Sequence, residues 1–202
     1  LQGCAKAEDP GAAHAAKATV SLVMETSAGA IEFDVYPGKA PVTANNFLAY
    51  VDGGHYDGGA FYRTVRPDND NNPLTISVIQ GGMQIIGAED TNPEPPFPPI
   101  AHESTDITGL SHADGALSMA RFMPGTAQSE FFISIGDNPV LDHGGERFED
   151  RLGFAVFGQV TAGMDVVTRI HSSEADAPTD IAYIEGQILT TPVRIVSLRR
   201  MQ

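Results

Sequence analysis

Short runs of β-branched and aromatic residues, separated by glycine, proline and acidic turn residues, recur along most of the chain. Two of these runs, 19–26 and 29–36, are separated only by Ser27 and Ala28, which is the spacing of a β-hairpin. The remaining predicted strands span 60–65, 75–80, 115–120, 131–135, 154–160 and 192–198. Many short strands favour a mainly β fold, and we predict a closed eight-stranded antiparallel β-barrel.

Two segments instead carry apolar residues at helical spacing. The first, 41–54, begins with a proline and ends with two glycines, which are typical of helix starts and stops. The second spans 162–171. The stripe residues are Val42, Phe47, Leu48 and Val51 in the first segment and Met164, Val167 and Ile170 in the second. We expect both segments to form helices that cap the barrel.

Composition and charge limit the domain organisation and the partners. The chain has 202 residues, enough for a full hydrophobic core, and we assign 19–202 to one barrel domain and 1–18 to an N-terminal tether. Two irregular insertions, 66–74 and 87–109, interrupt the strand pattern. With 12 Lys and Arg against 26 Asp and Glu, the net charge is −14, which argues against nucleic acid as a partner.

The chain contains a single cysteine, so an internal disulfide framework and a cysteine-based zinc site are excluded. This cysteine, Cys4, ends the sequence L-Q-G-C. The sequence resembles the end of a bacterial lipoprotein signal, where the chain is cut before the cysteine and the cysteine is lipidated. We therefore expect a lipidated Cys4 and a periplasmic or cell-envelope protein. The alternative is an ordinary thiol near the chain end.

A search for other chemistries finds no complete set of residues. The sequence has no G-x-S-x-G nucleophile motif and no H-E-x-x-H metal motif. Asp142 and His143 are adjacent, but the glycines that follow favour a surface turn. Residues 68–72 have the D-x-D-x-N spacing of a calcium loop, yet Pro73 stands where that loop needs glycine. We expect a solvated polar loop there; a metal-dependent surface domain is the alternative.

Two other features point to a site on the barrel wall. Arg63 lies in the middle of a predicted strand, among apolar and β-prone neighbours. Phe131 and Phe132 are adjacent on another strand, where successive side chains face opposite sides of the sheet. One ring therefore enters the core, and the other is available to floor a hydrophobic pocket on the outer face.

At these residues the chain resembles the cyclophilin-type peptidyl-prolyl cis-trans isomerases. Matching motifs follow the family's order from about residue 20 to residue 198. They are F-Y-R at 61–63, Q-G-G at 80–82, G-A-L-S-M-A at 115–120, S-E-F-F-I at 129–133, L-D at 141–142 and V-F-G-Q-V at 156–160. The turn after Asp142 and the sequence F-A-V-F-G in particular resemble bacterial, exported members.

The resemblance implies three catalytic residues: Arg63 as the catalytic arginine, Gln80 beside it, and Phe132 as the floor of the proline pocket. Substrate-binding positions are implied at Phe61, Met119, Ala120, Arg121, Phe122, Glu130, Leu141 and Phe154. Because 130 and 132 share a strand face, Glu130 is expected to contact Arg63, which would lower the pKa of the carboxyl group.

Several positions depart from the family pattern. Ser77 and Val78 stand where the family has a pocket aromatic and a methionine, and Glu130 replaces a glutamine. Val140 replaces a tryptophan or phenylalanine, and Phe154 replaces a histidine or tyrosine. The segment between the predicted catalytic arginine and glutamine is also longer than usual.

The activity that the resemblance implies is rotation about X–Pro peptide bonds. A twisted amide loses its resonance and regains a lone pair on nitrogen, so a nearby guanidinium stabilises it more than the planar forms. No cofactor, metal or covalent intermediate is required. The expected partners are proline-containing unfolded or flexible polypeptides outside the cytoplasm, and we expect a monomer. The alternative is a proline-peptide-binding or chaperone module of the same fold with weak or no turnover.

Overall fold

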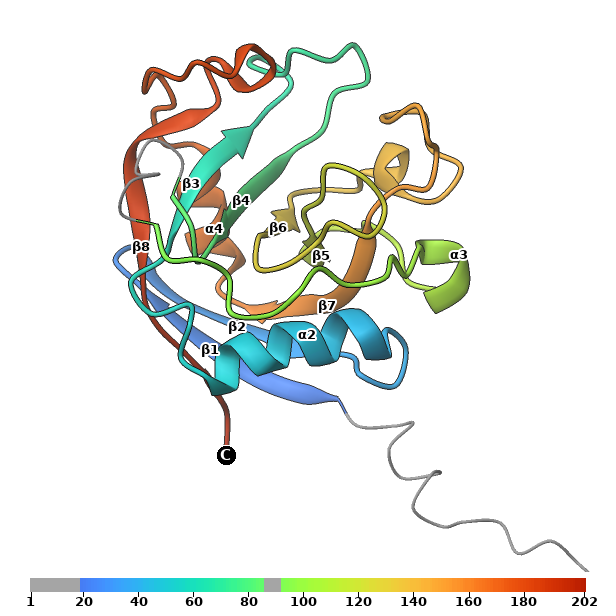
Figure 1. The fold of residues 1–202 in the computed structure, drawn as a ribbon. Coiled ribbons are helices and arrows are strands. Elements are labelled where there is room, and N and C mark those ends of the chain that lie inside the picture. The colour runs from blue at the N-terminus through green and yellow to red at the C-terminus, as the bar shows by residue number, and fades with distance from the viewer. Residues whose placement is uncertain (1–18, 86–91) are drawn as a thin grey trace, which may run out of the picture.

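The structure is a computed structural model that describes residues 19–85 and 92–202. Its strands close into a barrel in the order β1-β2-β7-β5-β6-β4-β3-β8, and all neighbouring strands are antiparallel (Figure 1). The strands are β1 (Val20–Thr26), β2 (Gly29–Val35), β3 (Ala60–Val65), β4 (Val78–Gly82), β5 (Ala116–Met119), β6 (Phe131–Ser134), β7 (Ala155–Ala162) and β8 (Ile188–Arg200). The predicted eight-stranded barrel is confirmed. The predicted tether 1–18, with Cys4, lies outside the described residues and stays a prediction.

Two strands, β4 and β8, begin three or four residues away from their predicted starts. β4 begins at Val78 instead of residue 75, because the preceding backbone bonds to loop side chains: the amide of Ile76 donates to Asp70 at 3.0 Å. β8 begins at Ile188 instead of 192 and contains Pro192. Its pairing with β3 is irregular just there, which accommodates a residue that has no N–H group for the ladder.

Helices α2 (Pro41–Asp52) and α4 (Met164–His171) are the two predicted helices. In Figure 1, α2 runs along the lower side of the barrel and α4 lies behind β3 and β4. Their buried apolar residues, including Phe47 and Val167, belong to the same apolar cluster as the barrel interior. Val42, on the predicted apolar stripe, is 41% exposed. A third, four-residue helix, α3 (Thr105–Thr108), lies within the predicted irregular insertion 87–109.

The two apolar clusters lie on opposite sides of the barrel wall. The larger one fills the interior and includes Phe131, as predicted for one of the two adjacent rings. The smaller one lies outside the wall and includes Phe132. Its buried members are Val65, Ile76, Val78, Phe132, Leu141 and Phe154. Strand alternation thus separates a structural core from a second apolar surface.

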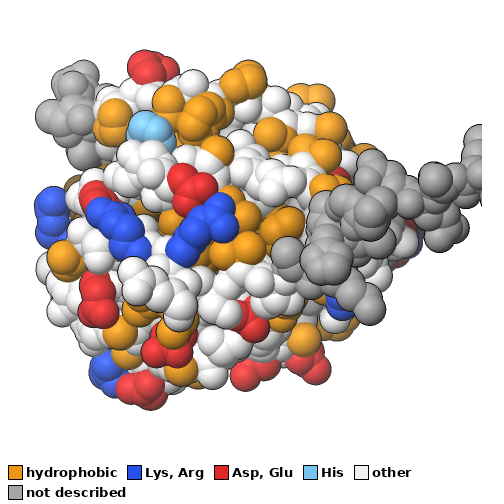
Figure 2. All heavy atoms as spheres, turned by 90° about the horizontal axis from the view of Figure 1, so that it is seen from below, with side chains coloured by type: hydrophobic (Ala, Val, Ile, Leu, Met, Phe, Trp, Pro, Cys, Tyr) orange, Lys and Arg blue, Asp and Glu red, His pale blue; other side chains and the backbone are white. Residues whose placement is uncertain are grey.

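Surface charges are interspersed on the face of the molecule shown in Figure 2. Two arginines near the end of β8 are paired: Arg199 with Asp57 at 2.5 Å, and Arg200 with Asp52 at 2.7 Å. Such exposed pairs contribute little to stability. Asp57 and Asp52 nevertheless neutralise two of the few positive charges of the chain.

No helix in the described part of the chain is long and apolar enough to cross a membrane.

The position of Phe131 predicts a large cost for its removal. Its ring is fully buried and lies 5.4 Å from the ring of Phe47, 5.6 Å from Tyr56 and 5.7 Å from Phe61. We expect Phe131→Ala to lower the free energy of unfolding by about 3–5 kcal/mol. Phe122→Ala, at a side chain that is 79% exposed, should change it by less than about 0.5 kcal/mol. Urea unfolding of both variants measures the difference, and equal effects would contradict this assignment of the core.

Candidate active site

The candidate site is built around a β-bulge in β3. On β4, Gly81 lies opposite Phe61. The neighbouring Gln80 lies opposite Arg63, so Tyr62 is an extra residue in β3. A bulge of this kind re-aims the side chains that follow it. Phe61 accordingly faces the interior, whereas both Tyr62 and Arg63 line a cavity on the outer side of the wall.

Two neutral amides hold the Arg63 guanidinium. Gln187 Oε1 accepts from Nε at 3.0 Å and from Nη2 at 2.6 Å, and Gln80 Oε1 accepts from Nη1 at 2.8 Å. Three of the five N–H groups are thus bonded within the described residues, which leaves two for a ligand. Burial lowers the pKa of Arg63, but a guanidinium stays charged at neutral pH.

A relay of hydrogen bonds connects Arg63 to Glu130 through Gln80 and Tyr62. The Tyr62 hydroxyl donates to Glu130 Oε2 at 2.7 Å, because an ionised carboxylate only accepts. The Tyr62 oxygen then accepts from Gln80 Nε2 at 2.9 Å. Because Gln80 uses its Nε2 for this hydrogen bond, its Oε1 points toward the Arg63 guanidinium. Glu130 therefore orients the Gln80 amide through an intermediate residue.

The predicted contact between Glu130 and Arg63 is wrong. Besides the bond in the relay, the Glu130 carboxylate accepts from the backbone amide of Gln84 at 3.1 Å and from Ser129 Oγ at 3.3 Å. Burial raises the pKa of Glu130, contrary to the predicted direction, because the loss of water outweighs these hydrogen bonds. Gly82 leaves the necessary room, since a Cβ at this position would meet the Glu130 carboxylate.

Beside the guanidinium lies the predicted apolar pocket. Phe132 is buried at its floor, and the Phe154 ring packs edge-on against it with centroids 5.3 Å apart. Ala120 and Leu141 line the same cavity. The whole cavity has a volume of about 740 Å³, within the range of sites that hold small ligands or short peptide segments.

A buried histidine supports the floor from the other side. The ring of His112 stacks on Phe132 at 5.7 Å and 10°. His112 Nδ1 lies 2.7 Å from Asp142 and Nε2 lies 3.0 Å from Ser118 Oγ, so Nδ1 donates to the carboxylate and Nε2 accepts from the hydroxyl. Burial lowers the pKa of His112, which keeps it neutral. Although the order serine–histidine–aspartate is that of a hydrolase triad, Ser118 is fully buried and cannot reach a substrate.

Two predicted substrate-binding residues are not in the cavity. Phe61 and Met119 both belong to the interior cluster and are almost fully buried. The physical reason is strand alternation: Met119 lies opposite the inward-facing Phe131, and Phe61 precedes the bulge. Both predictions are corrected to core positions.

Arg121 and Phe122 line the cavity but differ in accessibility. The Arg121 side chain is buried, binds Asp150 at 2.8 and 3.0 Å, and donates to the carbonyl of Gly153. Its guanidinium therefore fastens the loop 142–153 to the barrel, so only its backbone is available to pair with a substrate. Phe122 is 79% exposed at the rim.

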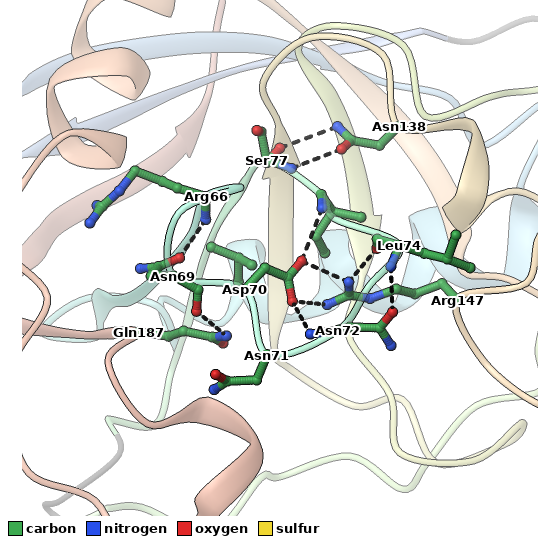
Figure 3. A network of polar contacts seen from close by, with 12 residues as sticks. Arg66, Asn69, Asp70, Asn71, Asn72, Leu74, Ser77, Asn138, Arg147 and Gln187 are labelled. Carbon is green, nitrogen blue, oxygen red and sulfur yellow. Dashed lines mark hydrogen bonds and ion pairs between the residues drawn. The ribbon is translucent and has the colours of Figure 1, made fainter.

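The connection between β3 and β4, residues 66–77, is named the arm. Figure 3 shows its polar contacts. Asp70 binds Arg147 of the loop 142–153 through two hydrogen bonds at 2.7 and 2.9 Å, and the Asp70 side chain is only 1% exposed. The prediction of a solvated loop is therefore wrong at Asp70. The same ion pair occupies the carboxylate that the calcium-site alternative would need.

Three residues of the site were missed by the sequence analysis. Gln187 lies far along the chain from Arg63, and no local pattern marks a glutamine after a turn as its partner. Tyr62 sits inside the F-Y-R motif and was treated as a neighbour of the functional residue. His112 was overlooked because the pairing of Asp142 was considered only with the adjacent His143, which contacts Asp106 at 3.8 Å.

Taken together, these residues place a cation with unused donors beside an apolar pocket. Among the described residues, no three His, Cys, Asp or Glu side chains are grouped so as to hold a metal ion. An arginine in this position can donate a hydrogen bond to an uncharged polar atom of a ligand while an adjacent apolar group of the same ligand fills the pocket. It is thus suited to bind an amide whose nitrogen substituent is a small apolar ring.

Comparisons with known proteins give a consistent result. Residues 21–199 match the family model described as cyclophilin-type peptidyl-prolyl cis-trans isomerase/CLD. A peptidyl-prolyl cis-trans isomerase of Acinetobacter baylyi is 36% identical over 186 residues, covering 91% of this chain and 87% of the relative. Peptidyl-prolyl cis-trans isomerase A of Dickeya dadantii is 35% identical, covering 81% and 77%.

Solved structures resemble the fold as well. A cyclophilin-type peptidyl-prolyl cis-trans isomerase of Cryptosporidium parvum aligns with a TM-score of 0.64 at 20% identity, covering 92% of this chain and 99% of that one. The same protein in the presence of the dipeptide Ala-Pro aligns with a TM-score of 0.62 at 21% identity, covering 90% and 99%. These similarities support the barrel assignment.

The relay predicts that Tyr62 acts on turnover through Gln80. We expect Tyr62→Phe to lower kcat/KM for a proline peptide by about 3- to 10-fold, because the Gln80 amide loses the acceptor that orients it. In a Gln80→Ala background the same change should have little further effect. Tyr36→Phe, outside the cavity, is the matched control. An undiminished effect of Tyr62→Phe in the Gln80→Ala background would contradict the relay.

Proposed function

The chain belongs to the cyclophilin-type peptidyl-prolyl cis-trans isomerases, and we propose that it rotates X–Pro bonds with Arg63 as the transition-state donor and Phe132 as the floor of the proline pocket. Isomerase activity follows from the family. The observation that carries the residue roles is the arrangement of Arg63, which is bonded to two neutral amides and has two N–H groups to spare beside the apolar cluster.

The reaction needs the amide to lose its double-bond character. Rotation of the C–N bond faces a barrier of ~18–20 kcal/mol. Halfway through, the prolyl nitrogen becomes pyramidal and accepts a hydrogen bond that the planar forms cannot accept. An Arg63 N–H aimed at this nitrogen therefore binds the transition state better than either isomer, which is the condition for acceleration.

Neutral partners suit this role better than a carboxylate would. A carboxylate bound to Arg63 would compete with the prolyl nitrogen for its donors and would offset its charge. Gln80 and Gln187 fix the guanidinium plane while leaving the full positive charge directed at the pocket. The Glu130 carboxylate is separated from Arg63 by two side chains, Gln80 and Tyr62.

Arg63 does not account for the whole acceleration. An acceleration of about 10⁵-fold corresponds to about 7 kcal/mol. One hydrogen bond from a charged donor contributes about 1.5–3 kcal/mol. The remainder falls to immobilisation of the proline ring by Phe132, Leu141 and Phe154, to exclusion of water from the amide, and to backbone pairing along residues 121 and 122.

For the cellular setting, the proposal is an exported isomerase that acts as a monomer on unfolded or flexible proteins of the periplasm or cell envelope. The support is the L-Q-G-C sequence, in which Cys4 would carry a lipid, followed by a tether of 14 residues, 5–18, before the barrel. An anchored barrel on such a tether would reach client segments near the membrane surface.

Replacing Arg63 tests its role. We expect Arg63→Ala to lower kcat/KM for an X–Pro peptide by at least ~10- to 100-fold, which is roughly 1.4–2.7 kcal/mol of transition-state stabilisation. The variant leaves the buried Gln187 amide without this donor, so the assay should be run well below its melting temperature. Arg199→Ala removes an exposed arginine as a control. Activity of Arg63→Ala within twofold of wild type would end the proposed arginine mechanism.

A second experiment tests the anchor. We expect the full-length precursor, expressed in a bacterium that processes lipoproteins, to sediment with membranes, and Cys4→Ser to release it into the soluble fraction. Ser27→Ala is a control for expression. Soluble wild type with a free Cys4 thiol would refute the lipid anchor and leave the isomerase assignment intact.

A further inference from the structure

The arm extends the candidate substrate cavity beyond the proline pocket. Asp70, Asn71 and Asn72 line the same cavity as Arg63 and Phe132. So do Arg147 and Phe148 of the loop 142–153, and Ile181, Tyr183 and Ile184 around the 3₁₀ turn η3 (Ala182–Ile184). We call this part of the cavity, with walls from three loops, the second compartment.

The arm is held rigidly at this place. Asn69 Nδ2 donates to the carbonyls of Thr64 at 3.2 Å and Gly186 at 2.9 Å. The Asn69 carbonyl in turn accepts from Gln187 Nε2 at 3.0 Å, so the arm also fixes the residue that binds Arg63. The compartment is thus connected to Arg63 by hydrogen bonds through Gln187 as well as by the shared cavity.

The wall around η3 is tied to the arm by hydrogen bonds. Asn71 Nδ2 donates to the carbonyl of Glu185 at 3.1 Å and lies 3.5 Å from the carbonyl of Tyr183. These contacts fix the backbone around η3, where two side chains stay open to solvent: Ile181, just before η3, is 37% exposed, and Tyr183 is 57% exposed. A fixed backbone that presents exposed apolar side chains into a cavity is typical of a binding surface.

The third wall, where the arm meets the loop 142–153, carries an ion pair whose two charges neutralise each other. Both Asp70 oxygens accept from Arg147, and they also accept the backbone amides of Asn72 and Ile76 at 3.0 Å each. The Arg147 guanidinium donates further to the carbonyl of Leu74 at 2.5 Å. The two charged groups of this buried pair bind each other and backbone groups, so the pair fixes the arm and offers no charge to a ligand.

We propose that this compartment, which we call the arm subsite, binds an apolar side chain, aromatic or branched, of the residue that flanks the proline in the bound peptide. It rests on the isomerase function. Three observations support this ligand. The compartment is continuous with the proline pocket, and the cavity volume of about 740 Å³ exceeds what one proline needs. Its walls combine apolar side chains, among them Phe148 and Ile181, with an ion pair whose charges neutralise each other. Ile181 and Tyr183 are the specificity-determining residues.

The test compares kcat/KM for peptides with Phe, Leu, Ala or Asp placed on either side of one X–Pro bond. For wild type we expect Phe and Leu to exceed Ala by about three- to tenfold at one of the two flanking positions, with Asp the poorest. In Ile181→Ser and Tyr183→Ser the ratio of Phe to Ala at that position should fall toward one. Tyr183→Phe, which keeps the ring, should retain the preference.

The matched control is Val196→Ser, at a side chain that is 62% exposed on β8 and does not line the cavity; the preference should be unchanged. Circular dichroism and melting curves show whether each variant folds. Equal rates for all flanking residues in wild type, or a preference that survives both Ile181→Ser and Tyr183→Ser, would overturn the arm subsite. Absence of turnover on every peptide would instead overturn the isomerase function itself, so the two failures are distinguishable.

Discussion

The β-bulge at Tyr62 is the constraint on which the site depends. In a regular strand, Arg63 would face the same way as Phe61 and would be buried in the barrel interior. The bulge reverses the alternation, so that Thr64 turns inward and donates to the carbonyl of His171, while Val65 joins the outer cluster with Phe132. Closing the barrel fixes the rest: β4 and β6 bring Gln80 and Phe132 to the same outer surface because they are paired directly across the two strands.

The second organising principle is the use of neutral amides around a buried cation. Arg63 lies between Gln80 and Gln187, and each glutamine is oriented by a further partner, Tyr62 on one side and the Asn69 carbonyl on the other. One hydrogen-bond chain ends on the Glu130 carboxylate and the other on the backbone of the arm. Each glutamine is therefore fixed by a residue from outside its own segment.

Much of the fold was predictable because barrel strands are local patterns. Alternation placed Phe131 and Phe132 on opposite faces, and the ordered motifs placed Arg63 and Gln80. The sequence did not predict that Phe61 and Met119 face inward, or that Glu130 is separated from Arg63. Spacing along a strand shows which residues share a face, but it reveals neither a bulge nor a side chain that lies between two residues. The Asp70–Arg147 and His112–Asp142 pairs join loops that are far apart in sequence, and such pairs have no local signal.

We propose that Arg63 acts on the twisted amide and not on the planar substrate. Exchange NMR on an Ala-Pro-containing peptide measures rotation on the enzyme separately from the affinity for each isomer. The account predicts that Arg63→Ala slows rotation on the enzyme by at least about tenfold while both dissociation constants stay within about threefold of wild type. Weaker binding of both isomers with an unchanged rotation rate would contradict it, because Arg63 would then bind planar and twisted amides equally.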